Sequence, residues 1–559
     1  MKPFLKATEN KLVFYCDYSR RNAAKAIPEY CWNDEFKCWE YPKEENIIKK
    51  IKQAFPLVLM DAKASDLYRK AVAAEELADQ KKAELWAEVS PIAPMPIKVT
   101  PFKHQVVGFN TGITLPAAAI LFEMGCGKSL TAIAIAGQRF IQGDIKRLLI
   151  VCPAAVMPVW PKEFEDYADF SFEAKAIEGK GAKRKDLLLS WARRNDVLQA
   201  AVINYEAAWR LEDELKQWAP DMIICDESQR IKTPGSKQSK CLHDLGRLVK
   251  YRLILSGTPV SNTPLDFFSQ YKFLAPEIFG SSFYSFRNKY AILGGYENRE
   301  VVGYRNLDKL IKSAHSVAVR VTKKQALDLP EMVDQRVYCE LEPEAQRTYR
   351  QLARDCIAEL SESSRLTAPQ VITRLLRFSQ ITGGFLNDDD GTVHQISKAK
   401  RQLFKELLLD LLGADKKVVV FCRFIPEIKA IMQFLKDIEI DFAEIYGDTA
   451  QQMRGEHVKK FQQDLNCKVF LAQIQTAGLG ITLTAADTAI FYSMDYSYAN
   501  YEQARARIHR IGQKNICTYI HLLAKGTIDE EIMQALKNKK SLADSIVDNY
   551  QKILGEKAQ

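Results

Sequence analysis

The sequence predicts an α/β protein with two lobes built on parallel sheets, helical insertions and a small α+β module at the N-terminus. Short apolar runs alternate with helical patterns over residues 101–274, which is typical of a parallel sheet covered by helices. The same alternation returns after residue 412, and residues 276–412 are mostly helical in pattern. The runs interpreted as buried strands are AAILFEM, RLLIVCP, QAAVINY, DMIICDE and YRLILSGTP in the first zone, and KKVVVFCRF, FAEIYGD, KVFLAQIQ, TAIFYSMD and CTYIHLL in the second.

The N-terminal region ends at a proline-rich connector. Residues 12–60 combine short β-rich pieces with the helical pattern EENIIKKIKQAF. A helix-forming stretch over residues 62–89 precedes PIAPMPIKVTP, whose prolines make a stiff, extended link. We predict an α+β module over 1–62, a helix and connector over 63–96, a first lobe with a helical extension over 97–330, and a second lobe with a helical insertion and a C-terminal helix over 331–559.

Composition, charge and cysteine spacing limit which class of protein this chain can belong to. Apolar residues make up 47% of the chain and charged residues 27%, which is ordinary for a folded globular protein. The net charge of +9 would help a polyanion to approach without identifying one. The apolar run over residues 148–160 is short and broken by prolines, and the first residues are charged where a signal peptide is apolar, so we expect a cytoplasmic protein without membrane contact. A compact chain without bromodomain-like or chromodomain-like appendages favours a bacterial or phage setting. The twelve Cys include no CxxC pair, so we expect no structural zinc.

A glycine-containing turn joins a predicted strand to a predicted helix in AAILFEMGCGKSLTAIAIA. Gly125 and Gly127 would let backbone N–H groups close around phosphate oxygens at the helix N-terminus. Lys128 would reach the β and γ phosphates of ATP, and Ser129 would ligate Mg²⁺. Phe122 stands where the usual phosphate-loop pattern begins with glycine, so a chance glycine turn is the alternative interpretation.

Two adjacent carboxylates, Asp226 and Glu227, follow the predicted strand DMIIC about a hundred residues later. In a nucleotide site the first acid would hold Mg²⁺, and the second would orient and deprotonate the attacking water. Two solvated surface acids are the alternative interpretation. The alternative weakens because the pair follows a phosphate loop and ends a buried strand.

The late segment YEQARARIHRIGQ places Gln503, Arg507 and Arg510 at helical spacing on one predicted face. Arginines there would reach a γ-phosphate from a second lobe, so that hydrolysis occurs only when the lobes close. A solvated basic helix is the alternative.

The order of these motifs resembles that of the Swi/Snf-type ATPases of helicase superfamily 2, over about residues 98–550. The resemblance rests on a set of segments in chain order, which are FKHQVVGFN, FEMGCGKS, IVCPAAVMPVWPKEF, INYE, DESQRIKTP, LSGTPVSNTPLDFFSQYKFLAP, FCRF, IYGDT and QTAGLGITLTAADTAIFYSMDYSYANYEQARARIHRIGQ. It implies two RecA-like lobes that bind ATP and Mg²⁺ between them and move along DNA.

The resemblance also implies roles for individual residues. The residues expected to bind the nucleotide are Gln105 as the adenine-recognising glutamine, Met124, Gly125, Cys126, Gly127, Lys128, Ser129 and Gly480. Those expected to act in catalysis are Lys128, Asp226, Glu227, Gln503 and the arginine-finger positions Arg507 and Arg510, with Ser129 and Asp226 on the metal. Those expected to contact duplex phosphates are Pro153, Lys232, Thr476 and Gly478. Thr258 lies in the motif that couples hydrolysis to lobe movement.

The chain departs from the family pattern at two places. Ser228 and Gln229 replace a small residue and a His, which leaves both carboxylates intact and puts the coupling of hydrolysis to DNA in question. Arg320 and Lys323 keep only part of a further family signature.

The N-terminal stretch AAKAIPEYCWNDEFKCWEYP is similar to the HARP module of annealing helicases, whose aromatic and basic residues bind DNA forks. That similarity implies that Trp32, Trp39 and Tyr41 stack on exposed bases. The alternative is that these rings fill a small core.

The function expected from these patterns is ATP-dependent translocation on double-stranded DNA, with remodelling or annealing of branched DNA. A strand-separating DNA or RNA helicase would share the ATP site, but it would lack the second-half motifs in this form. A non-catalytic nucleic-acid-binding scaffold is a third possibility, against which the presence of Lys128, Glu227 and Arg510 argues.

Overall fold

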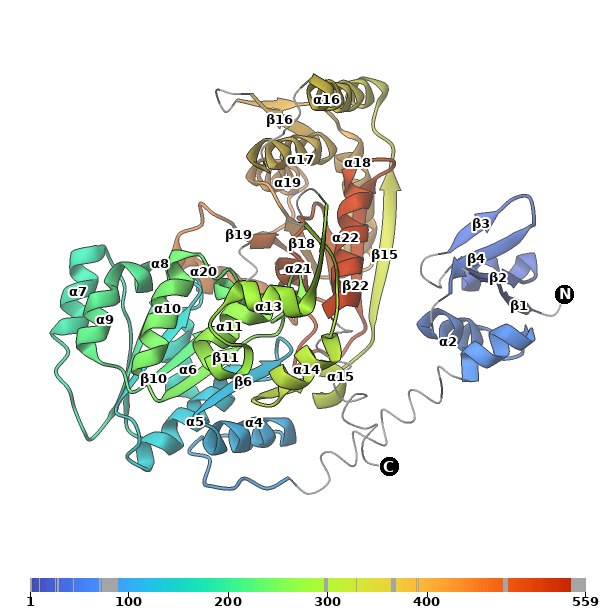
Figure 1. The fold of residues 1–559 in the computed structure, drawn as a ribbon. Helices are drawn as coiled ribbons and strands as arrows, with labels where there is room; N and C mark the ends of the chain where they lie inside the picture. The colour runs from blue at the N-terminus through green and yellow to red at the C-terminus, as the bar shows by residue number, and fades with distance from the viewer. Residues whose placement is uncertain are drawn as a thin grey trace. The chain divides into compact units, whose positions relative to one another are not determined.

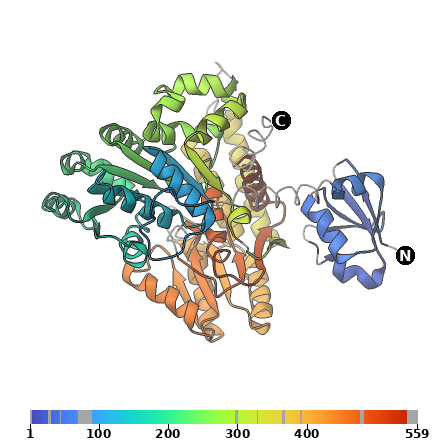
Figure 2. The ribbon, with the colours of Figure 1, turned by 90° about the horizontal axis from the view of Figure 1, so that it is seen from below.

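The computed structural model describes residues 3–543 apart from 10, 26, 28–29, 44, 70–71, 73–88, 296–299, 328, 363–367, 389, 391 and 476–480. The chain forms two compact units (Figures 1 and 2). The first comprises Met1–Glu88 with Glu331–Tyr338 and Thr518–His521, and the second comprises Val89–Pro330, Cys339–Cys517 and Leu522–Gln559. Within the described residues, no helix is both long enough and apolar enough to cross a bilayer.

A five-stranded sheet organises the N-terminal residues, in the order β3-β4-β2-β1-β5. Its strands are β1 (Phe4–Ala7), β2 (Lys11–Tyr15), β3 (Cys31–Asn33), β4 (Cys38–Pro42) and β5 (Leu59–Met60), with helices α1 (Arg21–Lys25) and α2 (Glu45–Ala54). Ile47, Ile48 and Ile51 of α2 are buried, as their helical spacing predicts. Residues 62–69 are helical, and the rest of the helix predicted over 62–89 lies largely outside the described residues.

The first lobe is built on a seven-stranded sheet in the order β14-β6-β11-β10-β7-β9-β8, in which every neighbouring pair is parallel. Its strands are β6 (Ala117–Phe122), β7 (Arg147–Cys152), β8 (Phe172–Ala176), β9 (Leu198–Asn204), β10 (Met222–Asp226), β11 (Tyr251–Leu255) and β14 (Ala318–Val321). Every residue of β6, β7 and β10 is buried, because helices cover both faces of the sheet.

Helices and one hairpin complete this lobe. The helices are α4 (Lys103–Thr114), α5 (Lys128–Ile141), α6 (Val159–Tyr167), α7 (Gly181–Leu189), α8 (Tyr205–Ala208), α9 (Glu212–Trp218), α10 (Lys237–Leu248), α11 (Phe267–Leu274), α12 (Pro276–Phe279), α13 (Phe283–Tyr290), α14 (Leu307–His315) and α15 (Lys323–Ala326). The hairpin consists of β12 (Ala291–Gly294) and β13 (Glu300–Tyr304).

The second sheet has six strands in the order β15-β22-β21-β18-β20-β19. Its strands are β15 (Met332–Cys339), β18 (Val418–Cys422), β19 (Phe442–Ile445), β20 (Val469–Gln473), β21 (Thr488–Phe491) and β22 (Cys517–Ala524), and the pairs around β18 and β20 are parallel. Its helices are α16 (Pro343–Glu362), α17 (Ala368–Gly383), α18 (Ala399–Gly413), α19 (Ile425–Asp437), α20 (Gln451–Gln463), α21 (Tyr498–Arg505) and α22 (Ile528–Ala543), with a hairpin of β16 (Phe385–Asn387) and β17 (Val393–Gln395). Two parallel α/β sheets confirm the predicted fold class.

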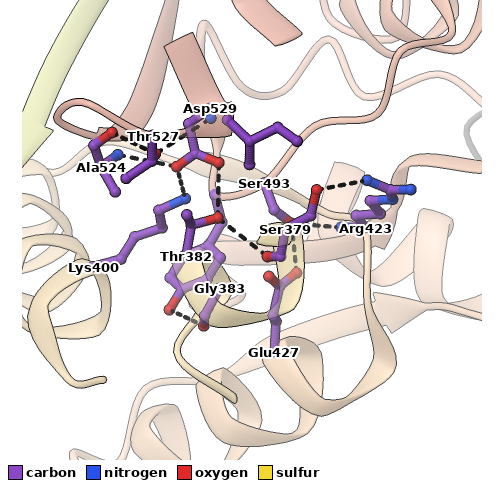
Figure 3. A network of polar contacts seen from close by, with 12 residues as sticks. Ser379, Thr382, Gly383, Lys400, Arg423, Glu427, Ser493, Ala524, Thr527 and Asp529 are labelled. Atoms are coloured by element: carbon purple, nitrogen blue, oxygen red, sulfur yellow. Dashed lines mark hydrogen bonds and ion pairs between the residues drawn. The ribbon is translucent and has the colours of Figure 1, made fainter. Parts of the chain in front are cut away.

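A buried polar network holds the C-terminal helix α22 onto the second lobe (Figure 3). Asp529, at the start of α22, accepts from the Lys400 ammonium at 2.5 Å and from the Thr382 hydroxyl at 2.9 Å. Lys400 and Asp529 are almost fully buried, so each charge depends on the other for compensation. Nearby, Glu427 accepts from the Ser493 hydroxyl at 2.5 Å. The network therefore anchors α22 to α17 and α18.

Candidate functional site

The predicted phosphate loop lies between β6 and α5. Gly125 and Gly127 have positive φ values of +86° and +79°, a region that favours glycine, and Gly127 is the N-cap of α5. A Cβ on Gly127 would lie 2.1 Å from the side-chain nitrogen of Gln105, so a larger residue would have to displace the Gln105 side chain as well as adopt a strained backbone. The loop therefore places backbone groups at the N-terminus of α5, which is the arrangement that binds anions.

Two side chains of α4 pack around this loop. Gln105, on α4, donates to the Cys126 carbonyl at 3.4 Å and accepts from the Phe102 amide at 2.9 Å. His104 shares the same carbonyl at 2.8 Å, and sequence reasoning assigned it no role. Gln105 therefore lies against the loop, and its recognition of adenine stays a prediction.

Met124 and Cys126 have buried side chains, so only their backbone groups are available to a nucleotide. Burial raises the pKa of the Cys126 thiol to about 11, which keeps it a neutral, small hydrophobe. Lys128 donates to the carbonyl of Phe122 at 3.2 Å. The Lys128 ammonium thus contacts the carbonyl of Phe122, and it would leave this contact to bind a phosphate.

Glu163 of α6 lies beside these groups and was missed by sequence reasoning. Burial raises the pKa of its carboxyl, while a hydrogen bond with Ser129 and the positive charges of Arg510 and Lys128 lower it. The segment IVCPAAVMPVWPKEF contains Glu163, but nothing in that pattern alone predicted its place beside Ser129.

The carboxylate pair ends β10, on the same edge of the sheet as the phosphate loop, with β11 between the two strands. Asp226 is 7% exposed and accepts from the Trp160 indole at 3.2 Å. Burial, followed by the negative charge of Glu227, raises the pKa of Asp226 to about 7, and the charge of Lys128 opposes the shift. Such a carboxylate favours a nearby cation, and burial excludes the alternative that Asp226 is a solvated surface acid.

Glu227 has a left-handed backbone, with φ +53°, which is uncommon for a residue with a Cβ. Gln229 donates to its carboxylate at 2.7 Å, and the Ser256 hydroxyl donates to the amide oxygen of Gln229 at 2.8 Å. The Thr258 amide in turn donates to the Ser256 hydroxyl at 3.1 Å. Gln229, the departure from the family pattern, therefore connects Glu227 to the predicted coupling segment.

The second-lobe residues Gln503, Arg507 and Arg510 do not share one helix, so the predicted helical face is wrong. Helix α21 ends at Arg505, because the Arg507 guanidinium caps the Gln503 carbonyl at 3.0 Å and the Arg507 carbonyl accepts from the Leu483 amide instead. Gln503 and Arg507 are buried, which excludes a solvated basic face for them. Burial lowers the pKa of Arg507 to about 10, helped by the charge of Arg510 and opposed by that of Glu227.

Arg510 lies against the phosphate loop of the first lobe. A Cβ on Gly125 would lie 3.2 Å from the Cβ of Arg510. Burial lowers the pKa of the Arg510 guanidinium, and Glu163 opposes the shift. The structure therefore brings a cation of the second lobe to the loop.

A further connection between the lobes runs through Lys323. Its ammonium donates to the His509 carbonyl at 2.6 Å, and its amide donates to the Glu123 carboxylate at 2.8 Å. The His509 ring in turn contacts the Pro330 carbonyl at 2.9 Å. Arg320 pairs with Glu123 at 3.4 Å. Arg320 and Lys323, the residues of the partial family signature, therefore both contact Glu123 at the start of the phosphate loop. Lys323 also holds the segment that carries Arg510.

A polar cavity of about 440 Å³ lies between the lobes. Pro153 and Lys232, two of the predicted DNA contacts, line it together with Gln229 of the first lobe and Gln503 of the second. Thr476, Gly478 and Gly480 lie outside the described residues. The cavity is thus a candidate nucleic-acid site that adjoins the carboxylate pair.

Asp226 and Ser129 would hold Mg²⁺ only together with the phosphates of a bound nucleotide. Asp226 and Ser129 supply a carboxylate and a hydroxyl, the oxygen ligands that Mg²⁺ takes alongside substrate phosphates. Within the described ranges, no group of three or more His, Cys, Asp or Glu side chains is placed to hold a metal ion by itself.

The N-terminal aromatics divide into buried and exposed rings. Tyr41 is 2% exposed and donates to the Ala24 carbonyl at 2.8 Å, and Trp39 is 6% exposed. These two rings fill the core of the small sheet, so the prediction that they stack on bases is wrong. Trp32 remains exposed over buried Trp39, with ring centroids 4.7 Å apart, and Tyr30 and Phe36 are exposed nearby in sequence.

Comparisons with known proteins agree with these motifs. A family model described as SNF2-related domain matches residues 42–383, and one described as helicase conserved C-terminal domain matches residues 399–512. The SNF2-related match thus begins inside the segment predicted as a separate N-terminal module.

Individual relatives are distant, and the two curated ones are longer than this chain. An uncharacterized ATP-dependent helicase of Mycoplasma genitalium is 27% identical over 424 residues, 75% of this chain and 39% of its own. A DNA repair and recombination protein RAD54-like of Drosophila ananassae is 27% identical over 477 residues, 76% of this chain and 59% of its own. A Sulfolobus solfataricus SWI2/SNF2 ATPase core solved in complex with dsDNA is 25% identical, with a TM-score of 0.40 and coverage of 82% of this chain and 95% of that one. The chain spans about 39 to 59% of the length of these two curated relatives.

Proposed function

This chain belongs to the SNF2-related family of DNA-dependent ATPases, and from that premise we propose that it is an ATP-dependent translocase on double-stranded DNA that remodels or anneals branched DNA. One observation carries the proposal. Arg507, which is buried, and Arg510, which is partly exposed, belong to the second lobe and lie at the carboxylate pair and the phosphate loop of the first, as an ATP site formed between two lobes requires.

Each residue has a distinct part in hydrolysis. Lys128 and the loop amides bind the phosphates of ATP. Glu227, held by Gln229, accepts a proton from the attacking water. Arg510 stabilises the negative charge that develops on the transferred phosphoryl group. Ser129 and Asp226 would hold Mg²⁺ together with the phosphates, and the ion would neutralise charge on the nucleotide.

The nucleic-acid site supports a duplex substrate that is bound without reading its sequence. Lys232 lies in the 440 Å³ cavity, and exposed Arg230 lines it as well. Both contact phosphates rather than base edges, so binding is salt-dependent and tolerant of sequence. Since Gln229 lines this cavity and also holds Glu227, DNA in the cavity acts on the residue that positions the base of the reaction.

The deciding experiment compares ATP hydrolysis by the full chain on duplex, single-stranded and forked DNA and on RNA, at one salt concentration. We expect stimulation by duplex DNA, displacement of a third strand from a triplex, and no separation of a plain duplex. Glu227→Gln serves as the inactive control. Stimulation by single strands with duplex unwinding would instead indicate a strand-separating helicase, and no hydrolysis with any nucleic acid would indicate a binding scaffold.

A further inference from the structure

The C-terminal helix α22 brings Lys539 to the interlobe cavity. The Lys539 ammonium donates to the Tyr496 carbonyl of the second lobe at 2.8 Å and lies 3.3 Å from the amide oxygen of Asn262 in the first lobe. Asn262 and Ser497, the residue after Tyr496, line the cavity. One cation of α22 therefore touches both lobes at the rim of the cavity.

Lys232 contacts the same turn of the first lobe. Its ammonium donates to the Ser261 hydroxyl at 2.7 Å, and Ser261 is the neighbour of Asn262. Burial and the positive charge of Lys232 lower the pKa of Lys539, so the two ammonium groups repel one another. Two cations held beside one turn favour an anion between them.

The carboxylates near the two lysines already accept hydrogen bonds from other groups. Asp266 accepts from the backbone amides of Ser261 and Asn262 at 3.0 and 2.8 Å. Asp495 accepts from the Ser497 amide at 2.9 Å and from Asn500 at 3.0 Å. In the part of the chain that the structure describes, neither Lys232 nor Lys539 has a carboxylate oxygen within 4.0 Å.

We propose that a backbone phosphate of the nucleic acid binds between Lys232 and Lys539, so that α22 contributes a contact to the DNA site; this rests on the proposed function. The phosphate replaces the 3.3 Å contact between Lys539 and Asn262, which is the longer of the two that Lys539 makes. A lysine at each side supplies a point charge to the phosphate, which suits sequence-independent binding.

This phosphate also connects DNA to the arrangement of the two lobes. Asp529 anchors α22 to the second lobe through Lys400 and Thr382 (Figure 3), whereas Lys232 belongs to the first lobe. A phosphate held by both lysines therefore stabilises the arrangement in which Arg510 lies against the phosphate loop.

The test measures the affinity of the full chain for a labelled 20-base-pair duplex by fluorescence anisotropy over a range of salt concentrations. Lys539→Gln should weaken binding at low salt about 3- to 10-fold and reduce the slope of log affinity against log salt by about 1. Lys540→Gln is the matched control, because Lys540 is the exposed next residue of the same helix, and it should leave the slope near the wild-type value. Lys539→Arg should retain most of the affinity.

A double-mutant cycle tests whether the two lysines share one phosphate. Lys232→Ala and Lys539→Gln together should weaken binding by less than the product of the single effects. Fully multiplicative losses, or an unchanged slope in Lys539→Gln, would overturn the shared site. Thermal unfolding of each variant checks that the fold is intact, and Lys539→Met, which preserves the length of the side chain, supplies a second neutral variant.

Parallel titrations with single-stranded DNA and RNA separate this inference from the proposed function. If Lys539→Gln reduces the slope of log affinity against log salt on any nucleic acid that the chain binds, the result supports the phosphate site, even if duplex translocation fails. Duplex translocation by the wild type with an unchanged slope in the variant overturns the phosphate site alone. Absence of binding to every nucleic acid overturns both.

Discussion

The Lys323 ammonium donates a hydrogen bond to the carbonyl of His509 at 2.6 Å, directly before Arg510. Lys323 follows β14 of the first lobe, and its amide is held by Glu123 beside the phosphate loop. The position of the arginine in the second lobe therefore depends on a lysine of the first. Burial lowers the pKa of Lys323 and Glu123 opposes the shift.

Lys323→Ala should reduce the maximal rate of ATP hydrolysis about 10- to 100-fold while nucleotide affinity stays close to wild type, because a misplaced arginine acts mainly on the transition state. Steady-state kinetics with fluorescent-nucleotide binding separate the two effects. Lys324→Ala, at the exposed neighbouring position, is the control. Equal losses in both variants would contradict a positioning role, whereas partial recovery in Lys323→Arg would support it.

Gln229→Ala should lower DNA-stimulated hydrolysis about 10-fold, since it removes the connection between Glu227 and Ser256, equivalent to roughly 1.4 kcal/mol. Hydrolysis without DNA should change less, because Glu227 itself remains. The ratio of stimulated to unstimulated rates is the measurement. An unaltered ratio would show that Gln229 only fills space beside the carboxylate.

Lys128→Ala and Glu227→Gln should both abolish turnover by different routes. Loss of the Lys128 ammonium weakens nucleotide binding or its alignment. Glu227→Gln keeps ATP bound but removes the base, with a loss of about 10²- to 10⁴-fold in rate. Calorimetric titration with a non-hydrolysable nucleotide distinguishes them. Near-normal hydrolysis by Glu227→Gln would assign the base to another residue.

Glu427 should make the stability of the second lobe depend on pH. Burial raises the pKa of its carboxyl from 4.5 to about 7, although Ser493 and Lys400 oppose the shift (Figure 3). The stabilisation of the protonated form is complete below about pH 4.5, declines as pH rises to about 7 and is absent above, a change on the order of 3 kcal/mol. Glu427→Gln should therefore match wild type near pH 5 and be the more stable at pH 8.

Hydrogen exchange in β18 is the appropriate measurement for this comparison, because all seven Trp lie at or before position 218 and do not report on the second lobe. Identical pH profiles of exchange in wild type and Glu427→Gln would place the titration elsewhere.

Trp32→Ala combined with Phe36→Ala should reduce the preference for forked over plain duplex DNA and leave duplex-stimulated hydrolysis unchanged. Both rings are exposed, at 41% and 62%, and are therefore available to stack on unpaired bases at about 1 to 3 kcal/mol each. Leu57→Ala, at an 82% exposed position of the same sheet unit, is the control. The fork-to-duplex affinity ratio is measured at matched salt, since phosphate contacts also shift with ionic strength. A constant ratio would leave these rings without a role in DNA recognition.

The sequence alone determined the features that depend on residues close together in the chain. The phosphate loop needs a strand, two glycines and a helix in one short stretch, and apolar runs predict buried parallel strands without knowledge of their partners. Strands β8, β14 and β15 were not predicted. β15, at the edge of its sheet, is interrupted by the three polar residues Asp334, Gln335 and Arg336 and is nowhere fully buried, so no apolar run marks it.

Only the tertiary structure decided the contacts between residues that are far apart in sequence. Lys323 meets His509 across 186 positions, and Lys539 meets Asn262 across 277. Likewise, helical spacing placed Arg507 on a helix that ends at Arg505, since the end depends on a hydrogen bond from Leu483 that no local pattern encodes. Aromatic residue types did not distinguish buried Trp39 from exposed Trp32, because burial depends on which neighbours cover a ring.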